Sequence, residues 1–244
     1  LEEAMKRLAN VPILFDPGEN FQYGMSTNVL GRVVEVASKM PFDRFIEDHI
    51  CRPLGMTDTF FKVPKEKRSR LAAVYVPGED HHIRKLGEQE TAIHGSVPIS
   101  SRYAYDEDQK FFSGGGGMCS TAPDYMRFCQ MLLNGGELFG VRLLKDSTVN
   151  LMTTNQIGDL AIPKSPDKFG FGVAVLPNND NIHEQLRGAY GWAGFWSTSF
   201  RISPRGDWVL ITMTQLAWDQ QATPEWFAEY EKLAADAVIN RARK

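Results

Sequence analysis

One tyrosine stands in a setting that would fix the direction of its hydroxyl. Tyr23 follows the turn Asp16-Pro17-Gly18, in which proline presets one backbone angle and glycine accepts the reversed one. Small residues after Tyr23 lead into an apolar-periodic helix that we expect from about Thr27 to Lys39. A phenol held between a tight turn and a helix start has a fixed position, so its hydroxyl can be aimed at a reacting group.

Three separate segments resemble a known family. The first runs from Phe15 to Gly31 and contains Tyr23, the second reads Pro53-Leu54-Gly55-Met56-Thr57-Asp58-Thr59, and the third runs from Gly114 to Leu144. All three resemble the serine β-lactamase-like hydrolases, which include class C β-lactamases, penicillin-binding-protein-like esterases and related acyltransferases. The resemblance implies a β-lactamase/transpeptidase-like fold, and it gives the second segment a structural rather than a chemical part.

The resemblance also implies serine acyl transfer, which needs a nucleophile, a base and two N–H donors for the oxyanion. In the family a tyrosine in the place of Tyr23 works beside a Ser-x-x-Lys motif, so Tyr23 is the candidate base. A free tyrosine has a pKa of about 10, and lowering it to about 7 takes roughly 4 kcal/mol in favour of the phenolate. The lysine of the motif is the usual source of that stabilisation in the family.

The nucleophile itself is missing from the expected place. In the family the Ser-x-x-Lys motif lies well upstream of the tyrosine, and the single match here is Ser165-Pro166-Asp167-Lys168, before a predicted strand. We interpret this match as chance. The first residues, Leu1 to Ala9, read as a helix already under way without an initiator methionine. We therefore expect a C-terminal portion of the fold that lacks its catalytic serine and lysine.

A further segment, near the end of the chain, also resembles the family. Gly191-Trp192-Ala193-Gly194-Phe195 resembles the Trp-Gly-Gly or His-x-Gly strand of related esterases. The resemblance makes Trp192, Ala193, Gly194 and Phe195 the substrate and oxyanion wall, with the Phe195 N–H as one oxyanion donor. The alternative interpretation of these residues alone is a strand whose glycines pack under a helix.

Two departures from the lactamase pattern bear on the substrate. Tyr23-Gly24-Met25 stands where lactamases have Tyr-x-Asn, and Trp192 stands where they have the lysine of Lys-Thr-Gly. The amide that binds the lactam side chain and the cation that meets a carboxylate are thus both absent. The departures favour an esterase-like site with an apolar pocket, to which Trp192, Phe195 and Trp196 contribute.

Two hypotheses about function follow. The first is a portion of a serine hydrolase, a carboxylesterase that forms an acyl-enzyme from small esters and acts weakly on β-lactams, inactive alone if the nucleophile segment is absent. The second is a non-catalytic binding or scaffold module of the same fold. A Ser-x-x-Lys at a helix start upstream would favour the enzyme, and its absence would favour the scaffold.

The composition narrows the possible partners. The chain has 244 residues, of which 43% are hydrophobic and 23% charged, and a net charge of −3. This balance is ordinary for a globular protein and speaks against nucleic-acid and membrane-surface binding. No apolar run approaches the roughly 20 residues that span a bilayer. The expected partner is a small ester or lactam substrate.

Cysteine and histidine usage indicates no cofactor or metal. Three cysteines (Cys51, Cys119 and Cys129) lie in apolar neighbourhoods, so we expect buried thiols, and their odd number favours a reducing, cytoplasmic compartment. His81-His82 lacks the further ligands that a metal needs. The run Ser113 to Gly117 lacks the Lys-Ser/Thr of a phosphate loop, so we expect its backbone to pack closely against a neighbouring element.

The order of the elements indicates an α+β fold. We expect a mostly helical region with cleft-bordering loops over residues 1–160, and antiparallel strands with a C-terminal helix over 161–244. Residues 79–110 read as an irregular loop after a strand at Leu71 to Val76. The expected helices after the first are Thr27 to Lys39, with Leu30, Val33, Val34 and Ala37 in one stripe, Phe42 to Ile50, a helix capped by Thr121, Asp146 to Thr153, and Pro224 to Arg241.

The expected sheet is a meander of strands at Phe169 to Leu176, Trp196 to Ile202 and Trp208 to Thr214. Phe227, Tyr230, Leu233, Ala234 and Val238 of the last helix are expected to cover one sheet face. In the family, strands from the N-terminal part complete the sheet beside its last strand. The edge at 208–214 is therefore expected to hold the missing N-terminal polypeptide or another chain.

Overall fold

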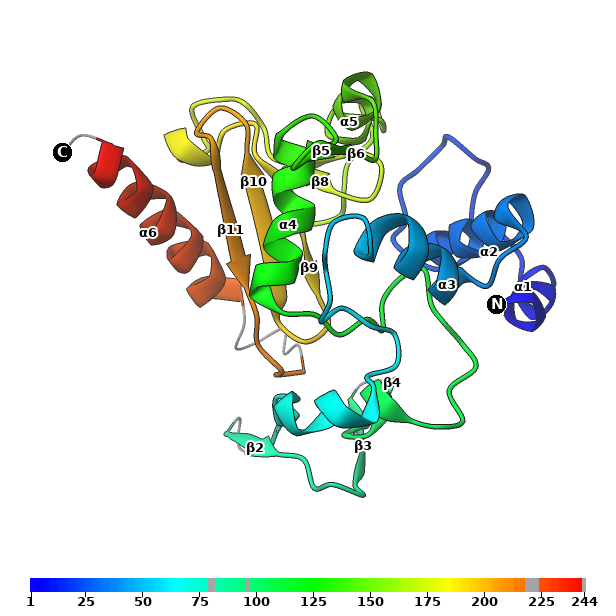
Figure 1. Ribbon diagram of the computed structural model, residues 1–244. Coiled ribbons are helices and arrows are strands. Elements are labelled where there is room, and N and C mark those ends of the chain that lie inside the picture. Colours follow the sequence, from blue (N-terminus) through cyan, green and yellow to red (C-terminus); the bar gives the residue numbers. More distant parts are fainter. Residues whose placement is uncertain (79–81, 95–96, 218–223, 243–244) are drawn as a thin grey trace.

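The computed structural model describes residues 1–78, 82–94, 97–217 and 224–242. A twisted antiparallel sheet stands at the centre of the molecule with one long helix on each side, as Figure 1 shows for α4 and α6. Helices α1, α2 and α3 form a separate group beside the sheet, and short hairpins lie beyond one end of it. This mixture of helices and an antiparallel sheet confirms the predicted α+β fold.

The helices match the predicted periodicity closely in position. The α-helices are α1 (Glu2–Leu8), α2 (Ser26–Ser38), α3 (Phe42–Ile46), α4 (Ala122–Leu133), α5 (Asp146–Met152) and α6 (Pro224–Ala242). A π-helical turn, Glu47–Cys51, continues α3, and 3-10 turns occupy Lys65–Arg70, Tyr103–Tyr105 and Glu184–Leu186.

The main sheet has five strands in the order β11-β10-β9-β8-β7, all antiparallel. Its strands are β7 (Lys168–Phe169), β8 (Ala174–Val175), β9 (Tyr190–Gly194), β10 (Thr198–Ser203) and β11 (Trp208–Thr212). Three two-stranded hairpins pair β1 (Tyr75–Pro77) with β2 (Ile83–Lys85), β3 (Thr91–His94) with β4 (Val97–Ser100), and β5 (Glu137–Leu138) with β6 (Val141–Arg142). Within the described residues β11 is an edge of the main sheet, as predicted.

Helix α4 begins and is buried as its sequence indicates. The Thr121 side chain accepts a hydrogen bond from the Asp124 backbone N–H at 3.3 Å, which is the predicted N-cap. Cys129, Met131 and Leu132 then pack in the largest core cluster, together with residues of β9 and β10. This core fixes one face of the sheet that carries the candidate wall.

Two predicted strands and one predicted loop differ from the structure. Residues 169–176 do not form one strand, because Gly172 takes a φ of +89° and the segment folds back as the hairpin of β7 and β8. Residues 79–110 are not simply irregular, since they contain β2, β3 and β4. The predicted strand at Leu71 to Val76 starts later, at Tyr75, and His81 lies outside the described residues.

The predicted covering face of α6 is also wrong. Glu231 and Ala235 are buried, at 9% and 1% exposure, whereas Tyr230, Leu233 and Val238 are exposed. The reason is an ion pair, because Arg201 of β10 reaches Glu231 with three N–O contacts of 3.0–3.2 Å and sets the rotation of the helix. The side chain of Phe227 lies outside the described residues.

The apolar stripe predicted on α2 does not face a core. Leu30 and Val33 are 61% and 54% exposed, and Ala37 is exposed as well. Val33 and Ala37 line an apolar groove of about 540 Å³ together with residues of α1. The helix forms at the predicted residues, and part of its apolar face lies along this groove beside α1.

Candidate active site

Tyr23 lies directly against the strand that was predicted as the substrate wall. Its ring stacks at a tilt on Trp192 of β9, with ring centroids 5.4 Å apart. Trp192 in turn meets Phe169 edge-on at 5.2 Å, and Phe169 meets Phe21 at 5.2 Å. These four rings form an aromatic row that connects the loop before α2 to the main sheet, and each contact is at a favourable distance for aromatic pairs.

The start of α2, just after Tyr23, is held by the glycine run. A Cβ on Gly114 would lie 2.1 Å from the Thr27 carbonyl oxygen, so only glycine lets the two backbones meet. Ser113 Oγ donates to the amide oxygen of the buried Asn28 at 2.6 Å and accepts the Gly115 N–H at 3.0 Å. The close backbone packing predicted for the glycine run is confirmed, and it fixes the helix end next to Tyr23.

Strand β9 carries Trp192, Ala193 and Gly194 of the predicted wall, and Phe195 follows it in the turn. Trp192 is half-buried against the main core cluster, Ala193 is exposed, Gly194 is half-buried and Phe195 is 38% exposed. Glycine is required at Gly191, where a Cβ would lie 2.0 Å from the Phe200 carbonyl oxygen of the paired strand β10. The structure thus brings Tyr23 against Trp192, one of the four predicted wall residues, from segments far apart in the sequence.

The Ser-x-x-Lys match at 165–168 has the local contacts of a loop. Ser165 Oγ accepts the Asp167 backbone N–H at 3.2 Å, and Lys168 Nζ donates to the Leu160 carbonyl at 2.8 Å. Ser165 follows a turn, and Lys168 begins β7. Neither residue begins a helix, as the sequence indicated.

The segment Pro53 to Thr59, called the signature segment below, is held in place by the carboxylate of Asp124. From the sequence, Asp124 was interpreted only as part of a helix start. Asp124, 6% exposed, accepts the Asp58 backbone N–H at 2.7 Å and the Thr59 hydroxyl at 2.9 Å. Leu54 and Met56 are buried in the main core. The segment therefore docks onto the N-terminus of α4, which gives the family signature its structural part.

Asp58 itself faces two cations on the next turn. Arg70 pairs with it through both carboxylate oxygens at 2.8 and 2.9 Å, and Lys67 Nζ contacts it at 2.6 Å. Hydrogen bonds from Arg70 and then Lys67 hold the pKa of the Asp58 carboxyl well below its usual range. These ion pairs tie the segment Pro53 to Thr59 to the 3-10 turn Lys65–Arg70.

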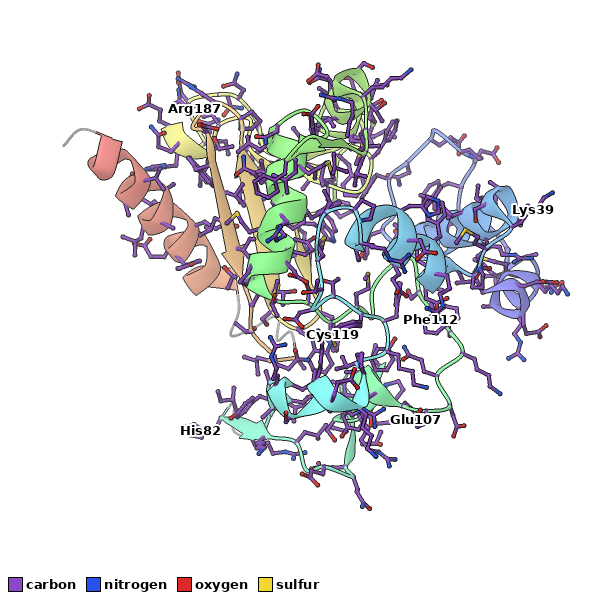
Figure 2. All side chains as sticks on the ribbon, viewed as in Figure 1. Lys39, His82, Glu107, Phe112, Cys119 and Arg187 are labelled. Atoms are coloured by element: carbon purple, nitrogen blue, oxygen red, sulfur yellow. The ribbon has the colours of Figure 1, made fainter. Side chains whose placement is uncertain are left out.

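The thiols lie as predicted for structural cysteines. Burial raises the pKa of Cys51 to about 11 and that of Cys129 to about 12, and both side chains are buried. Cys119 is half-buried, and its backbone bridges to Phe60 where the chain passes from the hairpins to α4 (Figure 2). Such thiols are poor nucleophiles, so they offer no substitute for the serine.

Other classes of site find no support in the described residues. That part of the chain holds no group of three or more His, Cys, Asp or Glu side chains placed to bind a metal. None of its helices combines the length and apolarity that crossing a bilayer requires.

Comparisons with known proteins bear on the family and the fold. Residues 1–232 match a family model described as Beta-lactamase. Protein Rv1367c of Mycobacterium tuberculosis is 29% identical over 220 residues, which cover 85% of this chain and 52% of the relative. Esterase EstB of Burkholderia gladioli is 27% identical over 230 residues, which cover 92% of this chain and 57% of the relative. The chain spans about half the length of these curated relatives.

A solved structure shows the same fold. EstCE1, a hydrolase with promiscuous acyltransferase activity, superposes with a TM-score of 0.77 over 97% of this chain and 61% of its own, at 24% identity. The predicted family and fold are thereby confirmed. With the family model matching nearly its whole length, this chain belongs to the Beta-lactamase family of serine β-lactamase-like hydrolases.

Proposed function

We propose that this chain is a portion of a serine hydrolase that forms an acyl-enzyme from small esters and, less efficiently, from β-lactams. The observation that carries the proposal is the contact of Tyr23 with Trp192, which places a phenol next to the strand that ends in Gly194. An exposed phenol beside a strand is suited to proton transfer on a substrate lying along that strand. Tyr23 is 56% exposed, so a substrate can reach it.

In the proposed reaction, Tyr23 takes the proton from a serine hydroxyl as the serine oxygen attacks the ester carbonyl. The carbonyl oxygen becomes an oxyanion, which accepts hydrogen bonds from the Phe195 N–H and from the N–H of the serine. When the tetrahedral intermediate collapses, the C–O bond to the alcohol breaks and the alcohol leaves with the proton from Tyr23. Water then attacks the acyl-enzyme by the same route and releases the acid.

The serine and the lysine that activates Tyr23 belong, in this proposal, to polypeptide outside residues 1–244. The matched relatives are about twice as long as the matched part of the chain, which leaves room for such a segment. Hydrolysis of p-nitrophenyl acetate tests the point directly. The 244-residue chain is expected to give no turnover above background. Clear turnover that disappears in Tyr23→Phe would mean that a nucleophile lies within the chain.

The preference for esters rests on the residues around Tyr23. Met25 stands where the lactamase pattern has an amide, and Trp192 takes the place of a lysine. Phe195 meets the ring of Trp196 edge-on at 5.1 Å, so the wall ends in apolar surface. A substrate with an apolar acyl group and no carboxylate suits these surroundings best. Parallel assays with p-nitrophenyl esters and nitrocefin on a nucleophile-bearing form would show the preference.

The same outside polypeptide is proposed to pair along β11. This strand is a sheet edge in the described residues, and its core-facing side chains Val209 and Ile211 pack on the main cluster while Met213 beyond it is 40% exposed. An uncovered apolar edge favours association with a further strand. We expect the isolated chain to self-associate in size-exclusion chromatography with light scattering. A stable monomer would contradict this part of the proposal.

A scaffold module of the same fold is the alternative, and one observation favours it: the described residues offer no Ser-x-x-Lys at a helix start. The two functions differ in a simple property, the presence of an activated serine in the protein that carries this chain. A fluorophosphonate label would react with the hydrolase and leave the scaffold unmodified.

A further inference from the structure

The turn that joins β9 to β10 contains an unusual buried serine. Ser197 takes a φ of +53°, a left-handed conformation that is uncommon for residues other than glycine, and it is fully buried. Its backbone N–H donates to the Gly194 carbonyl at 3.0 Å, which closes the turn that contains Phe195, the last residue of the candidate wall. A strained conformation of this kind persists only where surrounding contacts determine it.

A threonine two residues beyond the end of β11 supplies such a contact. The Thr214 hydroxyl lies 2.6 Å from the Trp196 carbonyl oxygen and 2.9 Å from that of Ser197, and donates to this pair of acceptors. In an extended strand successive carbonyls point in opposite directions, so one hydroxyl can meet both only where the backbone bends between them. The positive φ of Ser197 provides that bend, and Thr214 holds it.

The residues that follow Thr214 hold the outer hairpins in place. The Tyr75 N–H donates to the Gln215 carbonyl at 2.8 Å, and the Ala217 N–H donates to the Tyr75 carbonyl at 3.0 Å. Trp196 of the turn packs into the same cluster as buried residues of these hairpins and of the segment after β11. The cluster comprises Val74, Val76, Leu86, Ile99 and Ala217. Figure 1 shows the hairpins beyond the end of the sheet where β11 finishes.

We propose that Thr214 is a positioning residue for the candidate active site, and that residues 214–217 join the wall at Gly194-Phe195 to the outer hairpins. The proposal rests on the proposed function for its meaning. Thr214 itself touches no reacting atom. It acts through the turn, whose shape sets the direction of the backbone just after Gly194, and the shared segment makes that shape depend on where β1 lies.

The first test is amide hydrogen exchange by NMR on the 244-residue chain, with Thr214→Val to remove the hydroxyl and Thr214→Ser to keep it. Exchange at the Ser197 amide is expected to rise roughly tenfold in T214V, since a hydrogen bond that supports the turn is lost. The Tyr75 amide should move in the same direction, and T214S should stay near wild type. The Tyr125 amide in α4, bonded to the Thr121 carbonyl, is the internal control.

Unchanged exchange at Ser197 in T214V would overturn the proposal, and so would a T214S chain that behaves like T214V. If T214V does not fold, the wild-type chain offers a second measurement. The carbonyl carbon resonances of Trp196 and Ser197 should shift when the Thr214 hydroxyl is exchanged from hydrogen to deuterium. The absence of any shift would count against the bond.

A kinetic arm uses the longer, nucleophile-bearing protein and p-nitrophenyl acetate. T214V is expected to lower kcat roughly tenfold with KM unchanged, and T214S to restore it. Equal kcat in T214V and wild type would overturn the positioning part. A longer protein with no turnover at all would instead refute the proposed function, and the exchange data would still decide on the turn.

Discussion

Replacing Asp124 by alanine should weaken the contact between the segment Pro53 to Thr59 and α4. The expected loss in the free energy of unfolding follows from the hydrogen bonds of the carboxylate. The buried carboxylate accepts two hydrogen bonds, from the Asp58 N–H and the Thr59 hydroxyl. The Thr59 hydroxyl has a second partner in Ser120 Oγ at 2.8 Å, so its loss is partly compensated. The Asp58 N–H would be left without its acceptor, which costs about 1–3 kcal/mol.

A second contribution comes from the helix. Asp124 lies in the first turn of α4, where a negative charge contributes about 0.3–1 kcal/mol. Together these terms predict a loss of about 1–4 kcal/mol for Asp124→Ala. Asp124→Asn keeps one acceptor oxygen but loses the charge, so we expect about half that loss.

Urea unfolding followed by circular dichroism measures the effect. The urea concentration at the midpoint should fall by about 1 M for Asp124→Ala, because the free energy of unfolding of small proteins falls by about 1–3 kcal/mol per M urea. Asp108→Ala is the matched control, because it removes an equal charge from an exposed position. If Asp124→Ala unfolded within about 0.5 kcal/mol of that control, the signature segment would not depend on Asp124 and this reasoning would be refuted.

Three further outcomes are expected. Gly114→Ala should destabilise the chain by about 1–3 kcal/mol in urea unfolding, because its Cβ meets backbone, whereas Gly116→Ala, with open space around it, should not. The pKa of Asp58 is depressed in the folded state, so the ionised carboxylate stabilises the fold above a pH of about 4, and this contribution is lost as the pH falls further. The urea midpoint of Asp58→Asn should therefore change less between pH 5 and pH 3 than that of the wild type. Cys51 and Cys129 should react with Ellman's reagent at pH 8 only when urea unfolds the chain, and fast labelling of the native chain would contradict their burial.

Local signals in the sequence predicted local structure well. The Thr121 cap, the early proline and the apolar spacing are properties of a few adjacent residues, so α4 begins and ends where they indicate. Tyr23 was selected as a candidate for the same reason, since a tight turn and a helix start lie on either side of it. The glycine run was also interpreted correctly, because its missing Lys-Ser/Thr is itself a local feature.

What the sequence did not reveal depends on partners far along the chain. Asp58 and Asp124 are 66 residues apart, and the residues around each of them do not indicate the contact. The rotation of α6 depends on the Arg201–Glu231 pair, so an apolar count along the helix selected the wrong face. Thr214 was missed because only the folded sheet brings its hydroxyl to the turn after β9.

The apolar stripe of α2 illustrates a different limit. Its spacing predicts a helix correctly, but periodicity says nothing about which element covers the apolar face. Val33 and Leu30 are exposed, while Val34 is half-buried. The pattern therefore predicts the element and leaves its packing partner open.

Labelling with a fluorophosphonate, followed by peptide mapping, tests the central claim most directly. The protein is the longer polypeptide that carries this chain, compared with its Tyr23→Phe variant and with the 244-residue chain alone. The account predicts a label on one serine outside residues 1–244, slowed roughly 10²-fold or more in Tyr23→Phe, and no label on the chain alone. A labelled serine within residues 1–244, or equal labelling rates for Tyr23→Phe and wild type, would contradict it.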